Sequence, residues 1–152
     1  MTFAPRNILV PTDFSAPAEI ALEYAKDIAR THKSVIYIIH CLEPNVYSGD
    51  MTGAMADIGG AHQYLLEFSG NELKKKAISL ESEGFEVRIR TLDGGNPADE
   101  IVEYADANGI DLICIATHGR NGWARFMLGS IAERVLRKAM CAVLTVRRKG
   151  DE

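Results

Sequence analysis

A glycine-rich segment follows one of the most apolar runs of the chain. The run Leu112 to Ala116 (LICIA) leads into THGRNGWARFMLGS, which holds three glycines and ends on Gly129 and Ser130. Glycine permits backbone conformations and close approaches that other residues resist, and successive N–H groups of such a loop can surround a phosphate. The composition therefore fits two interpretations, a simple connection between a strand and a helix or a loop that binds the phosphates of a nucleotide.

The helix expected after this segment offers a further group for anions. Ser130 to Glu133 (SIAE) fits the Ser-x-x-Glu capping box, which predicts that the Ser130 hydroxyl accepts from the Glu133 amide. The amino end of a helix has unpaired N–H groups and attracts anions, by about 0.3–1 kcal/mol for one exposed anion. Because that is too little for tight binding, other groups of the loop must contribute, and Gly119 and the charged donor Arg120 are the candidates.

A second candidate segment lies near the amino terminus. Asp13 comes shortly after the apolar run Asn7 to Val10. A carboxylate there can accept from ribose hydroxyls or an adenine amino group, hold a metal ion, or only cap a helix. His40 and His118 lack the His-Glu-x-x-His spacing of a metal site. The Walker, dinucleotide-binding and Gly-x-Ser-x-Gly patterns are absent as well, so these local motifs alone do not define a reaction.

The elements that must position these residues alternate along the chain. Short apolar runs predict strands, and apolar residues recurring every three or four positions predict helices. Such alternation predicts an open parallel α/β sheet, Rossmann-like, with helices on both faces. Ligands bind such sheets where the winding reverses, beyond the carboxyl ends of the strands. The expected strands are 7–10, 35–41, 85–92, 112–116 and 142–146, and the expected helices are 16–31, 63–83, the one beginning at Pro97, and 130–138.

Several features mark the limits of these elements. Ser15 and Asn96 are expected N-caps, each followed by a proline in the first turn. The alternating pattern of 85–92 indicates a half-exposed strand at a sheet edge. Residues 43–61 hold four glycines and little periodicity, which predicts a long flexible loop.

The composition is that of one globular domain spanning residues 1–152. The chain is 47% hydrophobic and 25% charged with a net charge of −4, and no run approaches the ~20 apolar residues of a membrane helix. The amino terminus is too polar for a secretory signal, so we expect a cytoplasmic protein. The basic residues are scattered, so we expect no nucleic-acid surface. The three cysteines, Cys41, Cys114 and Cys141, are expected to be buried thiols rather than a disulfide or redox pair.

The ordered set of motifs resembles the universal stress protein family. It comprises ILVPTDFS near the start, a strand ending in IIH, GNPADEI, and HGRNGWARFMLGSIAERVLRKAMCAVLTVRR at the end, and it covers essentially the whole chain. Nucleotide-binding members carry Gly-x2-Gly-x9-Gly-[Ser/Thr] in the last region. Gly119, Gly129 and Ser130 match that pattern, whereas Ala116 stands where its first glycine would be.

The resemblance implies a sheet of order 3-2-1-4-5 that binds an adenine nucleotide, ATP with Mg²⁺ possible, and forms a homodimer through the last strand, Ala142 to Val146. It implies a stress-response regulator rather than a dedicated enzyme, and since no general base is evident for attack on a γ-phosphate, at most slow hydrolysis. The residues that match nucleotide-contacting positions are Pro11, Thr12 and Asp13 for the adenosine, Cys41 beside the adenine, and Ala116, Gly119, Gly129 and Ser130 around the phosphates.

Three alternatives stay open at this stage. Ala116 favours a dimeric interaction module of the same family that no longer binds nucleotide. An enzyme of the wider adenine-nucleotide α-hydrolase-like group, such as a nucleotidyl transferase, is a second alternative, although the His-x-Gly-His signature typical of such enzymes is absent. The charged tail 147–152 could also protect the edge strand and prevent dimerisation.

Overall fold

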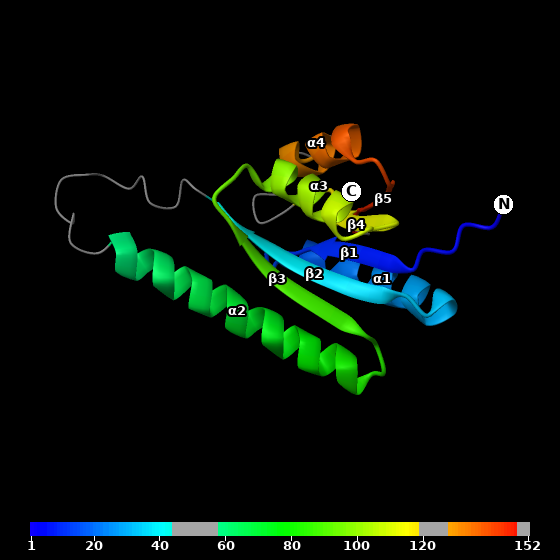
Figure 1. Ribbon diagram of the computed structural model, residues 1–152, viewed down its shortest axis with the longest axis horizontal. Coiled ribbons are helices and arrows are strands. Elements are labelled where there is room, and N and C mark those ends of the chain that lie inside the picture. Colours follow the sequence, from blue (N-terminus) through cyan, green and yellow to red (C-terminus); the bar gives the residue numbers. More distant parts are fainter. Residues whose placement is uncertain (44–57, 119–127, 149–152) are drawn as a thin grey trace.

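The protein is a five-stranded parallel sheet flanked by helices (Figure 1). The computed structural model describes residues 1–43, 58–118 and 128–148. The strand order is β3-β2-β1-β4-β5, and all four neighbouring pairs are parallel, which confirms the predicted fold class. The elements are β1 (Asn7–Pro11), α1 (Ala16–His32), β2 (Val35–Leu42), α2 (Ile58–Ser82), β3 (Val87–Asp93), α3 (Pro97–Ala107), β4 (Leu112–Ala116), α4 (Ser130–Lys138) and β5 (Ala142–Val146).

The helices form two layers, one on each face of the sheet (Figure 1). Leu22 of α1 and Leu73 of α2 belong to one apolar cluster with alternate residues of β1 and β2. Ile101 of α3 and Val135 of α4 belong to the cluster on the opposite face. Right-handed crossovers place α1 and α2 on one side because those connections run toward β3, and α3 and α4 on the other because they run toward β5.

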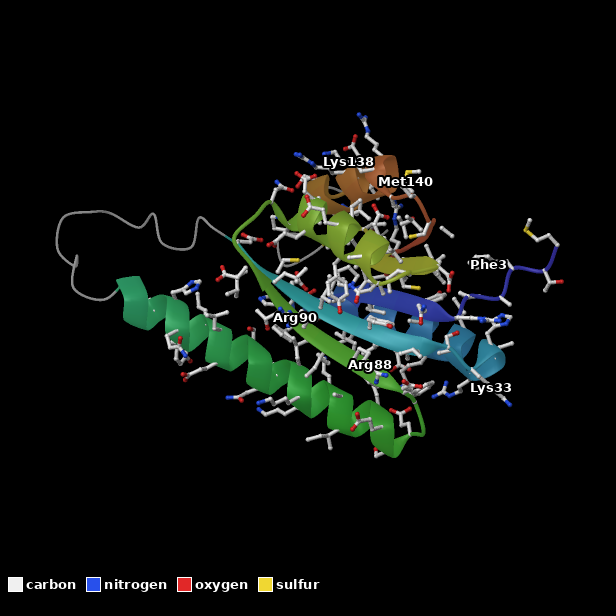
Figure 2. The ribbon with its side chains drawn as sticks, viewed as in Figure 1. Phe3, Lys33, Arg88, Arg90, Lys138 and Met140 are labelled. Carbon is white, nitrogen blue, oxygen red and sulfur yellow. The ribbon has the colours of Figure 1, made fainter. Side chains whose placement is uncertain are left out.

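The central strands are covered on both sides and the edge strands are not. Ile8 and Leu9 of β1 point to opposite faces, and both are fully buried. In β3 the residues alternate, with Val87 buried and Arg88 and Arg90 exposed at the sheet edge (Figure 2). The predicted edge position of this strand is therefore confirmed.

Two of the expected helix caps are present. The Ser15 hydroxyl accepts from the Ala18 amide at 3.4 Å, and the Asn96 side chain accepts from the amides of Ala98 and Asp99 at 3.1 and 3.4 Å. Each cap satisfies amides that the first helical turn leaves unpaired. These caps fix where the chain leaves β1 and β3 and turns back over the sheet.

The beginning of α2 differs from the sequence prediction. The helix begins at Ile58, so the last residues of the segment predicted as loop, 58–61, are helical. Gly59 and Gly60 disfavour a helix by about 1 kcal/mol each, but extending an existing helix adds a hydrogen bond per residue, whereas nucleation alone is costly. The rest of the predicted loop, 44–57, lies outside the described residues.

The winding of the sheet reverses between β1 and β4. These strands are neighbours, with Ile8 opposite Leu112 and Leu9 opposite Ile113, yet the chain leaves them toward opposite edges. The parallel arrangement brings the carboxyl ends of β1, β2 and β4 to the same end of the sheet, here called the carboxyl edge. Ligands bind at this end in open sheets. Among the described helices, none combines the length and apolar character needed to cross a membrane.

Candidate functional site

The segment after β1 forms a tight turn built by its own side chains. The Thr12 hydroxyl accepts from the Phe14 amide at 3.0 Å, and the Asp13 carboxylate accepts from the Ser15 amide at 3.0 Å. Thr12 is buried, with 8% of its surface exposed. Side chains of Thr and Asp commonly stabilise turns in this way, so the Asp13 carboxylate is held beside the start of α1 at the carboxyl end of β1.

The end of β2 fixes the same turn from the side. The Thr12 amide donates to the Ile39 carbonyl at 2.8 Å, and His40 Nδ1 lies 2.8 Å from the Thr12 carbonyl oxygen. From its sequence context His40 could be weighed only as a metal ligand, and this contact was missed. No spacing rule could have found it, because the two residues meet through the pairing of β1 with β2.

Cys41 lies one residue further along β2, against the start of α3. Its thiol donates to the Pro97 carbonyl at 3.8 Å. Burial raises the pKa of the Cys41 thiol to about 12, and the neighbouring Glu100 carboxylate adds to the rise. A thiol with so high a pKa stays protonated near neutral pH and is a poor nucleophile, so Cys41 acts here as a small packing residue.

Glu100 is a second residue that sequence reasoning missed at this edge. Burial raises the pKa of its carboxyl group, and the Gly95 amide partly opposes the rise. Its Oε2 is buried and has no hydrogen-bond partner among the described atoms. An unpaired buried oxygen is costly. Glu100 lies in the first turn of α3, where acidic residues are common, so no sequence pattern distinguishes it.

The end of β4 is closed by a contact with the start of α4. Ala116 pairs with Val146 of β5, and Thr117, which follows it, is buried. The Gly129 amide donates to the Thr117 carbonyl at 2.7 Å. A Cβ atom on Gly129 would lie 2.6 Å from that same oxygen, closer than real Cβ atoms come, so this position accepts only glycine without a backbone shift.

The prediction that Ser130 caps α4 is wrong. Gly129 is the N-cap, its carbonyl accepts from the Glu133 amide at 2.9 Å, and within the described residues no side-chain cap bond is made there. The bond between the Gly129 amide and Thr117 holds Gly129, rather than Ser130, at the cap position. Ser130 is consequently the first helical residue and is exposed, with its amide lacking a partner inside the helix.

His118 places another polar group beside this helix start. Its Nδ1 lies 3.1 Å from the Thr117 hydroxyl, whereas its Nε2 is buried and without a hydrogen-bond partner among the described atoms. Buried polar atoms are usually paired with protein, water or ligand. The backbone of His118 also approaches Gly129, so the unpaired nitrogen belongs to a residue next to the amino end of α4.

Most of the predicted site residues that the structure describes lie at the carboxyl edge of the sheet. Pro11 ends β1 and is followed by Thr12 and Asp13, and Cys41 is the last but one residue of β2. Ala116 ends β4, and the next residue along the chain bonds to Gly129, which precedes Ser130 at the start of α4. Gly119 and Arg120 lie outside the described residues. In the part of the chain that is described, no three His, Cys, Asp or Glu side chains gather as a metal site would require.

Comparison with known proteins identifies the same arrangement elsewhere. The family model of the universal stress proteins matches residues 5–147. Universal stress protein MJ0577 of Methanocaldococcus jannaschii is 32% identical, with 99% of this chain and all of that protein aligned. The solved structure of MJ0577 superposes with a TM-score of 0.82 at 29% identity, covering 97% of this chain and 99% of that one.

A further solved structure, a universal stress protein in complex with cAMP, superposes with a TM-score of 0.64. It is 24% identical and covers 95% of this chain and 98% of its own, and a likeness at that identity concerns the fold alone. The family match over nearly the whole chain and the relative at 32% identity are sufficient for a conclusion. The chain belongs to the universal stress protein family.

Proposed function

We propose that this protein binds an adenine nucleotide, ATP in the first place, at the carboxyl edge of the sheet between the β1 turn and the start of α4. The observation that carries the proposal is that these two segments follow adjacent strands at the reversal of winding. One segment presents the Asp13 carboxylate and the other the unpaired amides of a helix start. A carboxylate suits ribose hydroxyls and a helix start suits phosphates.

The roles follow from the chemistry of each group. Asp13 accepts from the ribose, since the two oxygens of a carboxylate can accept several hydrogen bonds at once. Pro11 and Thr12 precede it and border the adenosine, and Cys41 packs beside the base. At the other end, the Ser130 amide and hydroxyl donate to the phosphates.

The remaining phosphate contacts come from the glycine-rich segment. Gly119 takes part by the family pattern and Arg120 as a charged donor. The buried unpaired Nε2 of His118 supports a polar ligand at this place. Mg²⁺ would enter with the triphosphate, because ATP carries its own ligands for the ion. We propose a stress-response regulator in the cytoplasm that hydrolyses ATP slowly at most.

The protein acts as a homodimer in this proposal, joined through β5. This strand is an edge of the sheet, and an edge strand presents unpaired backbone groups to another chain. Met140, just before β5, is 85% exposed (Figure 2). An exposed apolar side chain beside an open strand edge favours pairing with a second copy.

An interaction module without nucleotide is the second candidate, and Ala116 is the observation that favours it. Its methyl group stands at the end of β4, where the nucleotide-binding pattern has glycine. If the methyl blocks the phosphates, the dimer forms but ATP does not bind.

Substitution of Ser130 tests whether the phosphates of ATP lie at the start of α4. We expect Ser130→Asp to weaken ATP binding about tenfold or more, since like charges ~4 Å apart repel by about 1–4 kcal/mol at effective dielectric constants between 80 and 20. The same change should not unfold the protein, because an acidic residue in the first turn stabilises a helix. Isothermal calorimetry with Mg²⁺-ATP measures the affinity, and Ser130→Ala is the matched control that removes the hydroxyl without adding charge. Equal affinity of the wild type and Ser130→Asp would place the phosphates elsewhere.

A further inference from the structure

His40 contacts both residues that flank Asp13. Its Nδ1 lies 2.8 Å from the Thr12 carbonyl oxygen, and its ring lies 4.7 Å from the Phe14 ring, centroid to centroid, with a tilt of 33°. A carbonyl oxygen can only accept, so Nδ1 carries the proton and donates. One side chain of β2 therefore holds the turn after β1 at two points.

The turn needs such support because its backbone is strained. Phe14 has φ of +62°, the left-handed region that costs a residue with a side chain about 1–2 kcal/mol. Strained residues of this kind persist where neighbouring groups hold them. The Phe14 ring also meets the Phe68 ring of α2, with the centroids 6.3 Å apart and the planes at 84°.

We propose that His40 is a positioning residue for the nucleotide site. Through the Thr12 carbonyl and the Phe14 ring it fixes the conformation of the turn that presents the Asp13 carboxylate, without touching the nucleotide itself. The inference rests on the proposed function for its consequence, tighter nucleotide binding. The positioning itself concerns contacts that are present without any ligand.

Three substitutions of His40 test whether a nitrogen donor at the position of Nδ1 is what the turn requires. Asn places an amide nitrogen at the position of Nδ1, Gln places it one carbon further out, and Leu removes the donor. Leaving the Thr12 carbonyl without its donor costs the observed conformation of the turn about 1–3 kcal/mol, which is a factor of roughly 5 to 150 in its population. We expect His40→Leu and His40→Gln to weaken ATP binding about tenfold or more, and His40→Asn to stay within about threefold of the wild type.

Calorimetry with Mg²⁺-ATP measures these affinities, and urea unfolding of each variant reports its stability. Rescue by Asn but not by Gln supports positioning, because a role in packing alone would not distinguish two amides by the reach of their nitrogen. If all three variants bind ATP as the wild type does, the proposal is overturned.

A measurement on the ligand-free protein keeps the test independent of the proposed function. Nitrogen NMR of the wild type should show His40 protonated on Nδ1, and the Phe14 and Ser15 amides should exchange with solvent faster in His40→Leu than in His40→Asn. A neutral ring protonated on Nε2, or equal exchange in these two variants, would overturn the positioning of the turn. A wild type that binds no ATP but shows the expected exchange would refute the nucleotide function and leave the positioning supported.

Discussion

The residue that most limits the proposed site is Ala116, which pairs with Val146 at the end of β4. Replacing it by glycine removes the methyl group where the family pattern allows close approach of the ligand. We expect Ala116→Gly to raise ATP affinity several-fold and to lower the free energy of unfolding by roughly 0.5–1 kcal/mol, since glycine loses more backbone freedom in a strand. Calorimetry and urea unfolding measure the two effects. An affinity that stays the same or falls would show that Ala116 does not face the phosphates.

The fully buried thiol of Cys114 makes stability depend on pH above the neutral range. Burial raises its pKa from 9.0 to about 12. The unfolded chain loses the thiol proton near pH 9, while the folded chain retains it. The contribution of the Cys114 thiol to the free energy of unfolding is therefore fully present below pH 9 and is lost as the pH rises toward 12. The loss approaches about 1.4 kcal/mol per pH unit.

The matched comparison uses Cys114→Ala. Between pH 9 and 10.5, the free energy of unfolding measured in urea should fall by about 1.5 kcal/mol more for the wild type than for Cys114→Ala. The lysines titrate in both proteins and cancel in the difference. Equal losses would mean that the thiol is not shielded from ionising.

Residues were predicted from the sequence where the signal is local. Ser15 and Asn96 cap their helices because a cap depends on amides two or three positions away. Ser130 met the same pattern and does not cap, because Gly129, held by its contact with Thr117, occupies the cap position. The roles of His40 and Glu100 depend on neighbours from other elements, which no local pattern contains.

At the scale of elements, the start of α3 depends on a single side chain. Asn96 accepts from two amides of the first turn. We expect Asn96→Ala to lower the free energy of unfolding by about 1 kcal/mol, whereas Asn96→Asp keeps the acceptor and stays within about 0.5 kcal/mol of the wild type. Urea unfolding of both variants tests this. A larger loss in Asn96→Asp than in Asn96→Ala would show that the cap is not what stabilises this end of the helix.

Element boundaries followed the sequence closely wherever hydrophobic periodicity was strong. The structure has β4, α4 and β5 at the predicted residues, because each is bounded by a change in apolar pattern. The start of α2 was placed too late, since Gly59 and Gly60 argue locally against a helix that the longer segment extends through them.

At the level of the whole molecule, the proposed dimer depends on β5, which is an edge strand of the described sheet. The Val146 carbonyl accepts from the amide of Thr117, the residue that follows β4, so the backbone groups of Val146 face β4. Successive residues of a strand turn their backbone groups to opposite sides. The amide of Thr145 therefore points away from β4. We expect Thr145→Pro to remove an outward donor, leave the β4 pairing intact and convert the dimer to a monomer.

Light scattering after size exclusion measures the mass. The wild type should show twice the 16.7 kDa of one chain, Thr145→Pro should show one chain, and Thr145→Val, which keeps the amide, should remain a dimer. A wild type that is monomeric would refute the assembly through β5, whatever the variants do.

The fold class was predictable because alternating strands and helices favour a parallel sheet with right-handed crossovers. The order β3-β2-β1-β4-β5 was implied by the resemblance to the universal stress proteins, and the structure has it. The location of the site follows from the order, since only one reversal of winding occurs between β1 and β4 in the described sheet. The identity of the ligand does not follow from the fold. It depends on groups such as Asp13 and Ser130, whose direction is set by contacts between elements.

Binding of ATP at the carboxyl ends of β1, β2 and β4 can be measured by calorimetric titration of the wild-type protein with Mg²⁺-ATP. AMP, cAMP and GTP titrated in parallel report the choice of nucleotide. We expect saturable binding of one ATP per chain with a Kd below about 1 mM, which corresponds to about −4 kcal/mol or better. The absence of saturable heat at millimolar ATP would contradict it and leave the dimeric interaction module as the function to pursue.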